Sequence, residues 1–237
     1  MSNYDQNTTA SGVARTDITA IDAGLRSHML NVYNYMAAGV GLTALVAWLT
    51  YQFIGPELLQ SPLMWLFILA PLVLVFFIGA RINTLSVSAA RSLFFVYAAL
   101  VGVSLSILFH IYTSSSITRV FFIAAATFGA LSIFGYTTRR DLSGLGTFLF
   151  MGLIGIIIAS LVNLFLRSTE LDWLISVVGV GVFAGLTAHD TQRIKAMYDS
   201  RDDETSAGRK SVIAALSLYL NFINLFMMLL RLSGGRR

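Results

Sequence analysis

Seven apolar stretches separated by polar joints constrain this chain more than any other feature of its sequence. They occupy residues 29–53, 63–82, 87–112, 120–136, 145–166, 173–191 and 212–232. About 20 consecutive apolar residues cross the hydrocarbon core of a bilayer as an α-helix. The runs are continuous rather than alternating in segments of about ten residues, which argues against a membrane β-barrel. The sequence therefore predicts an all-α membrane protein with seven transmembrane helices.

The composition excludes several classes of soluble protein. Charged residues make up 12% of the chain and hydrophobic residues 56%, whereas a soluble domain averages about 25% charged residues. So few charges cannot cover a soluble surface, which excludes an ordinary cytoplasmic enzyme, a disordered chain and a nucleic-acid binder. The absence of cysteine from the sequence also excludes disulfides, thiolate metal sites and cysteine nucleophiles.

The polar segments at the two ends divide the chain into three parts. Residues 1–28 hold no apolar run of signal-peptide length, so we expect a flexible N-terminal tail without a cleavable signal. Residues 29–232 form the predicted transmembrane domain, and residues 233–237 a short basic C-terminal tail.

The distribution of Lys and Arg predicts the orientation, because cytoplasmic loops carry an excess of these residues. With a cytoplasmic N-terminus, eleven of the 16 Lys and Arg residues face the cytoplasm and only Arg119 and Arg167 lie in outside loops. Seven spans place the last three, Arg231, Arg236 and Arg237, outside. We favour seven spans; the alternative is a hairpin-like last segment with an inside tail.

Asp190 is the first of three polar features in the apolar stretches. It follows an unbroken apolar run near the inner end of the sixth stretch. Charged groups cost several kcal/mol or more at the bilayer centre, so those near it are candidates for function. Asp190 either pairs with Arg193 at i+3 or faces a polar cavity, where its carboxylate binds a cation or a proton.

The second feature is Arg81, at the end of the second stretch on the same inner side. Its side chain either extends to the interface as an anchor or serves as the counter-ion of Asp190. In the second case the pair acts as a gate that protonation of Asp190 weakens.

The third feature is a polar stripe on the last stretch, formed by Ser217, Asn221 and Asn224. Their spacing of i, i+4 and i+7 places them on one helix face. Such a stripe either joins helices through hydrogen bonds or lines a central path.

Sequence motifs for catalysis are missing. The chain lacks the His-Glu-x-x-His pair of zinc proteases, the Gly-x-Ser-x-Gly elbow and a Walker-type phosphate loop. We therefore expect no enzyme and no nucleotide-driven pump. A membrane-embedded hydrolase would require Asp190, His189 and Ser86 to meet.

Three segments carry a resemblance to a known family. They read FIGARIN at 77–83, AHDTQRIK at 188–195 and ALSLYLNFINLF at 215–226. With these segments in order on seven predicted spans, the chain resembles the bacterial branch of the Bax inhibitor-1 family, also called the transmembrane Bax inhibitor motif family. The resemblance implies a seven-helix bundle in which the last helix is central and the other six surround it.

The resemblance also implies a pH-sensitive calcium leak with a defined site. In the family two carboxylates, on the sixth and seventh helices, share that site, and an Arg on the second helix pairs with the first carboxylate. Asp190 matches the first carboxylate and Arg81 matches the Arg, but the second carboxylate falls at Asn221. A site with one carboxylate should bind calcium weakly and respond to pH through one titrating group.

We therefore predict a passive, pH-sensitive cation leak channel for calcium, gated by protonation near Asp190, in the bacterial inner membrane. The expected partners are the lipid bilayer, calcium or other cations, and other membrane proteins, with no nucleic acid. No cofactor is expected beyond a transient calcium ion. The alternative is a non-conducting regulator that binds other membrane proteins in quality control or stress survival.

Overall fold

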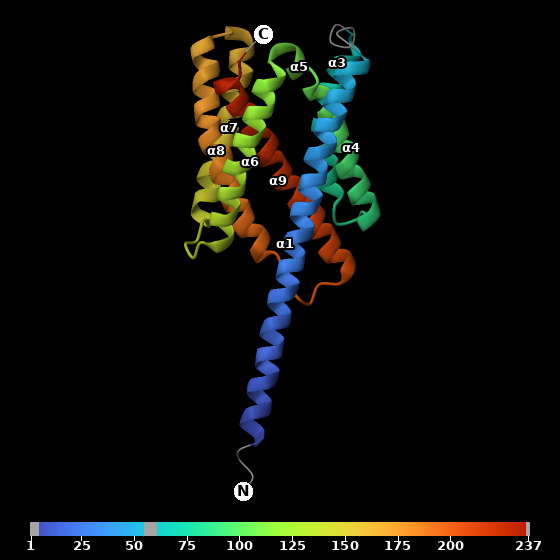
Figure 1. The fold of residues 1–237 in the computed structure, drawn as a ribbon, viewed down its shortest axis with the longest axis vertical. Helices are drawn as coiled ribbons and strands as arrows, with labels where there is room; N and C mark the ends of the chain where they lie inside the picture. The colour runs from blue at the N-terminus through green and yellow to red at the C-terminus, as the bar shows by residue number, and fades with distance from the viewer. Residues whose placement is uncertain (1–4, 55–60, 236–237) are drawn as a thin grey trace.

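The computed structural model describes residues 5–54 and 61–235, which form helices joined by short connections (Figure 1). The helices are α1 (Asp5–Phe53), α3 (Leu63–Arg81), α4 (Val87–Leu105), α5 (Leu108–Ile111), α6 (Ser114–Thr137), α7 (Ser143–Leu166), α8 (Thr169–Ala196) and α9 (Glu204–Ser233). Within the described residues, seven helical segments are long and apolar enough to cross a membrane, with α4 and α5 forming one of them. The prediction of seven transmembrane helices is confirmed.

Five of the seven spans, formed by α1, α6, α7, α8 and α9, are longer than the apolar stretches that predicted them. The sixth stretch, 173–191, lies within α8, and the seventh, 212–232, lies within α9. Hydropathy detects only the part of a helix that matches hydrocarbon, whereas polar residues continue the same hydrogen-bonded helix toward water. α1 likewise begins at Asp5, inside the segment predicted as a tail; the division of the chain at residue 28 stays a prediction.

Polar residues in the joints start several of these helices. A side chain at each N-cap accepts a hydrogen bond from a backbone N–H of the first turn. The capping residues are Ser86 for α4, Thr113 for α6, Ser168 for α8 and Asp203 for α9. The short joints therefore both end one span and fix the start of the next.

Successive spans alternate in direction, and α9 crosses the whole bundle (Figure 1). α9 is one continuous helix from Glu204 to Ser233. Its C-terminal end lies opposite the connections 82–86, 138–142 and 197–203 (Figure 1). The hairpin-like alternative for the last segment is therefore wrong. Arg236 and Arg237 of the C-terminal tail lie outside the described residues.

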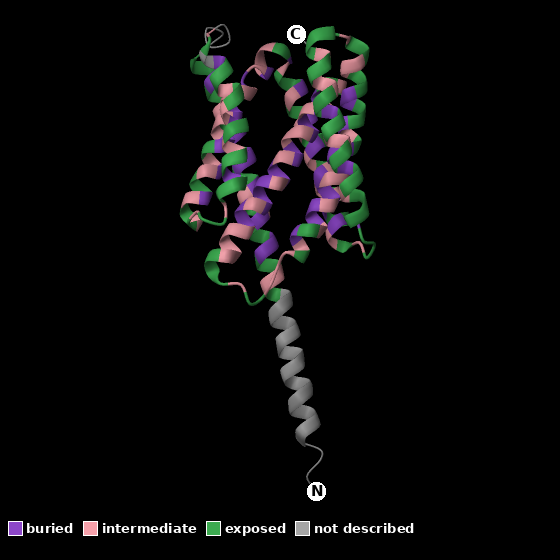
Figure 2. Ribbon diagram, turned by 180° about the vertical axis from the view of Figure 1, so that it is seen from behind, coloured by how far each residue is buried: buried purple, intermediate pink, exposed green. Residues whose placement is uncertain are grey.

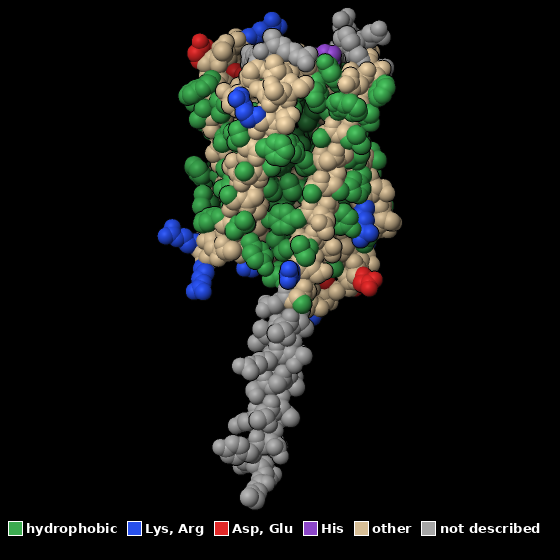
Figure 3. Space-filling view, in the orientation of Figure 1, with side chains coloured by type: hydrophobic (Ala, Val, Ile, Leu, Met, Phe, Trp, Pro, Cys, Tyr) green, Lys and Arg blue, Asp and Glu red, His purple; other side chains and the backbone are tan. Residues whose placement is uncertain are grey.

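α9 is the central helix, as the resemblance implies. Helices α1, α4, α6 and α8 pack directly against it, whereas α3 packs mainly on α4, and α7 on α8. Figure 2 shows buried residues gathered along the inner faces, and on α9 these include Leu218, Tyr219, Leu225 and Leu230. The six other helices surround α9 in two layers, with α3 and α7 in the outer one. Hydrophobic side chains cover the outer face between charged ends (Figure 3).

A buried hydroxyl pair fastens α9 to α1. The Oη of Tyr219 and the Oγ1 of Thr43 share a hydrogen bond of 2.6 Å, and the Thr43 hydroxyl also lies 2.8 Å from the carbonyl oxygen of Ala98 on α4. The rings of Phe94 and Tyr97 meet the Tyr219 ring edge-on. Such packing satisfies the polar atoms at membrane depth and fixes the rotation of α9.

On the other side of α9, α6 and α8 approach closely at a glycine. A Cβ added to Gly135 would lie 2.2 Å from the backbone oxygen of Ala188. Only glycine permits such a contact between helix backbones. The contact sets the position of α8 two residues before Asp190.

Candidate functional site

Asp190 lies on the buried side of α8, facing α9. Its carboxylate Oδ2 accepts a hydrogen bond of 2.9 Å from the Nδ2 of Asn221, and only 11% of the Asp190 side chain is exposed. Asp190 precedes the end of α8 at Ala196 by six residues, which at 1.5 Å per residue is about 9 Å. A carboxylate at this depth requires polar partners, because an unpaired buried charge is very costly.

The second carboxylate oxygen has two basic neighbours on its own helix. The Oδ1 of Asp190 lies 3.4 Å from Nη2 of Arg193 and 3.3 Å from Nδ1 of His189. Arg193 also donates a hydrogen bond of 3.1 Å to the Oγ of Ser217 on α9. The i+3 pair of Asp190 and Arg193 is therefore present, and Arg193 provides a second polar link between α8 and α9.

Asp190 also lines a cavity of about 570 Å³ between α7, α8 and α9. The three residues of the polar stripe, Ser217, Asn221 and Asn224, all face it. The two interpretations of Asp190 are therefore compatible, since the carboxylate both pairs with Arg193 and reaches the cavity. Asn224 also donates to the backbone oxygen of Leu220 in its own helix, so the stripe residues are not equivalent.

The contribution of α7 to this cavity was not predicted from the sequence. Ser143, Gly146 and Thr147 of its first two turns line the cavity opposite α9. A Cβ at Gly146 would lie 2.3 Å from the Nε2 of His189, so α7 and α8 meet closely there. The available signal was a cluster of small and polar residues at helical spacing at the start of the apolar stretch 145–166.

The structure does not bring Arg81 to Asp190. Arg81 is exposed at the end of α3, a helix that packs mainly on α4. Among the described residues, the ion pairs of Asp190 are with His189 and Arg193. In this structure the counter-ion of Asp190 is Arg193, one turn farther along α8, and not Arg81. The exposed position fits the interfacial anchor instead.

A hydrolase site is not assembled either. The Oγ of Ser86 accepts from the backbone N–H of Ala89 as the N-cap of α4, and Ser86 does not line the cavity at Asp190. In the described part of the chain, no group of three or more His, Asp or Glu residues is placed to hold a metal ion.

The donor set at Asp190 holds few oxygen ligands for a cation. It offers one carboxylate, the amide oxygen of Asn221 and the hydroxyl of Ser217. Calcium takes six to eight oxygen ligands, usually with several carboxylates among them. These donors alone would therefore hold calcium weakly.

Similarity to known proteins gives the family. Residues 25–237 match the profile of the family described as "Inhibitor of apoptosis-promoting Bax1". The chain belongs to the Bax inhibitor-1 family. It is 48% identical over 220 residues to the inner membrane protein YbhL of Escherichia coli K12, covering 91% of this chain and 94% of YbhL. It is 45% identical over 239 residues to the protein RP147 of Rickettsia prowazekii, covering both chains fully.

Membership of the Bax inhibitor-1 family, together with seven spanning helices, makes the protein a multi-pass inner membrane protein like YbhL. The Bax inhibitor-1 family is in general non-enzymatic. The resemblance recognised from the segments around Arg81, Asp190 and Asn221 is confirmed at the level of the family.

Proposed function

We propose that this protein is a passive, pH-sensitive cation leak pathway in the inner membrane, with calcium as a permeant ion and Asp190 as the group that protonation controls. The observation that carries the proposal is a nearly buried carboxylate that both joins α8 to α9 and lines a cavity. Ionisable groups at membrane depth mark ion and proton pathways by default.

The geometry supports a simple gating step. The ionised carboxylate holds Asn221 of α9 by a hydrogen bond and attracts Arg193, which itself reaches Ser217 of α9. Protonation at Asp190 removes the charge that attracts Arg193 and takes up one acceptor oxygen. Both links between α8 and α9 weaken together, so α9 is freer to move and the cavity can open farther.

The position of the site and the charge pattern support its facing the cytoplasm. Asp190 lies near the end of the bundle that carries the connections 138–142 and 197–203. Most Lys and Arg residues lie at this end under the predicted orientation, which is the pattern of cytoplasmic segments. We therefore propose a cytoplasmic N-terminus.

A non-conducting regulator that binds other membrane proteins is the second candidate. One observation favours it: Asn221 stands where the family resemblance expects a carboxylate, and both oxygens of Asp190 already have partners. A site closed in this way could stabilise a bundle that binds other proteins without passing ions.

Calcium flux into proteoliposomes at about pH 6 and about pH 8, one value on each side of neutrality, tests the proposal. We expect the wild type to leak more at the lower pH, and Asp190→Asn, which imitates the protonated state, to leak equally at both. Asp199→Asn, in the connection 197–203, is the matched control and should keep the pH response.

Two outcomes would contradict the proposal. If the wild type equals empty liposomes at both pH values while Asn221→Asp conducts, this chain has lost the ion site of its family. If neither conducts, the result favours the non-conducting regulator, and its protein partners should then be sought.

A further inference from the structure

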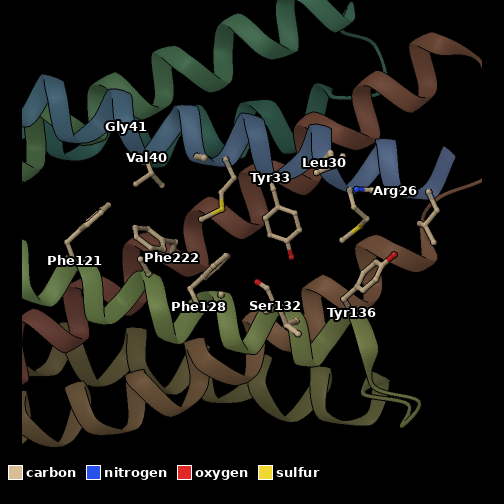
Figure 4. Close-up of a pocket in the computed structure, with 17 residues that line it drawn as sticks. Arg26, Leu30, Tyr33, Val40, Gly41, Phe121, Phe128, Ser132, Tyr136 and Phe222 are labelled. Atoms are coloured by element: carbon tan, nitrogen blue, oxygen red, sulfur yellow. The ribbon is translucent and has the colours of Figure 1, made fainter. Parts of the chain in front are cut away.

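A second, larger cavity opens on the side of the bundle, between α1 and α6. Helices α1 and α6 both pack on α9 but leave a groove of about 1070 Å³ between them (Figure 4). Its floor includes Phe222 of α9, with Phe121 and Phe128 of α6 beside it. The groove lies between the spanning segments Ala23–Phe53 and Ser114–Thr137, so it faces lipid at membrane depth.

Two glycines show that the groove is open rather than filled by its own walls. Gly41 lies on the α1 wall and Gly129 on the α6 wall. A Cβ added to either residue would meet no atom within 4 Å. Since the lining is almost entirely apolar and borders the hydrocarbon core, the natural occupant is a hydrocarbon chain rather than water.

Between its apolar part and its inner mouth, the groove is lined by the hydroxyl groups of Tyr33 and Ser132. The Oγ of Ser132 has no hydrogen-bond partner in the described part of the chain, although only 6% of Ser132 is exposed. The hydroxyls of Tyr33 and Ser132 point toward one another across the groove (Figure 4). Ser132 precedes the end of α6 at Thr137 by five residues, or about 8 Å, a depth that suits the ester carbonyls of a phospholipid below its phosphate.

The inner mouth of the groove carries positive charge. Arg26 lines the mouth on α1, is exposed, and forms no ion pair within the described residues. Opposite it, Tyr136 of α6 accepts a hydrogen bond at its backbone oxygen from Lys195, whose ammonium also lies over the Tyr136 ring. A guanidinium at the headgroup level is suited to a phosphate.

We propose that this groove binds one anionic phospholipid. Its acyl chain lies over Phe222, its ester group accepts a hydrogen bond from Ser132, and its phosphate meets Arg26. The assignment to the cytoplasmic leaflet rests on the orientation proposed above, but binding itself does not depend on conduction. One contact joins the groove lining to the helix of the Asp190 site, since the Oη of Tyr33 lies 3.4 Å from the Oγ1 of Thr191.

Native mass spectrometry of the purified full chain, with phosphatidylglycerol or phosphatidylcholine added at equal concentration, tests the proposal. We expect one bound phosphatidylglycerol, held about five-fold more tightly than phosphatidylcholine, the factor for one basic residue near an anionic headgroup. Arg26→Gln should remove this preference. Arg139→Gln, which removes an inner positive charge away from the groove, should keep it.

Filling the groove tests the place of the acyl chain. Gly129→Phe should abolish binding of phosphatidylglycerol, and Gly41→Phe, on the opposite wall, should do the same if the first variant does not fold. Gly155→Phe is the matched control, because Gly155 on α7 also has open space beside it but lies outside the groove. Size-exclusion profiles identify any variant that fails to fold.

Three results would overturn the proposal. The first is equal binding of both lipids that Arg26→Gln leaves unchanged. The second is binding that folded Gly129→Phe and Gly41→Phe reduce no more than Gly155→Phe does. The third is a dimer of this chain that dissociates when the groove is filled, which would assign the groove to a second copy.

Discussion

Asn221 on α9 donates a hydrogen bond of 2.9 Å to the carboxylate of Asp190 on α8, and both side chains are buried. The amide of Asn221 can donate to this carboxylate, whereas a second carboxylate at the same place would repel it. The Asp190–Asn221 pair is therefore an electrostatically stable closed contact. In the proposed gating step, its release follows protonation of Asp190 alone rather than of two acids that share a proton.

Replacing Asn221 by Asp should change the number of protons that control the leak. Two carboxylates this close titrate as a coupled pair in two steps. We expect the pH dependence of flux to broaden from one step to two. The added charge should raise the apparent affinity for calcium by about tenfold, which corresponds to about 1.4 kcal/mol. A flux titration against pH at several calcium concentrations measures both effects.

Asn224→Asp is the control for this experiment, since Asn224 lies on the same stripe and in the same cavity but bonds to Leu220 of its own helix. A new charge there should leave a single-step titration. If Asn224→Asp broadens the pH response as much as Asn221→Asp does, charge in the cavity matters and the Asp190–Asn221 contact does not.

His189 also faces Asp190, with its Nδ1 3.3 Å from the carboxylate, and histidine side chains serve as pH sensors in many proteins. Because Asp190 also carries the contacts to α9, we expect it to be the sensor. The flux through His189→Gln should therefore remain pH-dependent and differ from the wild-type flux by less than about threefold. Such a factor corresponds to a free-energy difference of less than about 1 kcal/mol. A pH-independent flux in His189→Gln would transfer the sensor role to the histidine.

The connection between α8 and α9 should not contribute to the pH response at neutral pH. Hydrogen bonds from Arg201 lower the pKa of Asp199 to about 2. A carboxyl with a lowered folded-state pKa stabilises the fold above its unfolded pKa, and this contribution disappears as the pH falls through the folded value. Asp199 therefore stays ionised throughout the flux measurements, and Asp199→Asn should shift the midpoint of the pH titration by no more than the experimental error. A shifted midpoint would show that the connection takes part in sensing.

The sequence was sufficient for the number of spans and for the choice of Asp190 and the polar stripe as candidates. Hydropathy identifies helices in hydrocarbon, and a lone carboxylate or a row of amides in such helices is conspicuous. The segment AHDTQRIK at 188–195 also indicated the family to which the chain belongs. Helix ends were less well predicted, because α8 and α9 continue in polar sequence that hydropathy does not score.

The partners of Asp190 could not be chosen from the sequence. Arg81 and Arg193 were both candidates on the inner side, and only the packing of α3 on α4 separates the first from α8. The cavity wall formed by Ser143, Gly146 and Thr147 was equally hidden, since small residues serve helix packing and cavities alike. The groove at Phe222 depends on two helices failing to meet, which no local pattern encodes.

The hydroxyl of Tyr219 should contribute measurably to the stability of the bundle. Tyr219→Phe removes one buried hydrogen bond to Thr43, but the Thr43 hydroxyl keeps the backbone oxygens of Gly39 and Ala98 within reach. We expect a loss of about 1 kcal/mol, the usual value for such a bond, in unfolding measurements in detergent. Tyr97→Phe is the control, because the Tyr97 hydroxyl has no hydrogen-bond partner within the described residues. Equal losses in both variants would mean that ring packing, rather than the hydrogen bond, is being measured.

Substitution of Gly135, which packs against the backbone of Ala188, should affect both the stability of the bundle and the proposed gating. A methyl group at Gly135 would overlap the backbone oxygen of Ala188, at 2.2 Å, and a backbone atom cannot rotate away as a side chain does. Gly135→Ala must therefore push α8 from α6, at a cost of about 1–3 kcal/mol for overpacking, and displace Asp190 relative to Asn221. Gly181→Ala, on α8 with open space around it, should instead be neutral or stabilising by up to about 1 kcal/mol from helix propensity. Thermal unfolding of the two variants in detergent, followed by flux measurements on each, separates the effects. A Gly135→Ala protein as stable as Gly181→Ala would show that α6 and α8 can separate freely, and that their contact does not position the site.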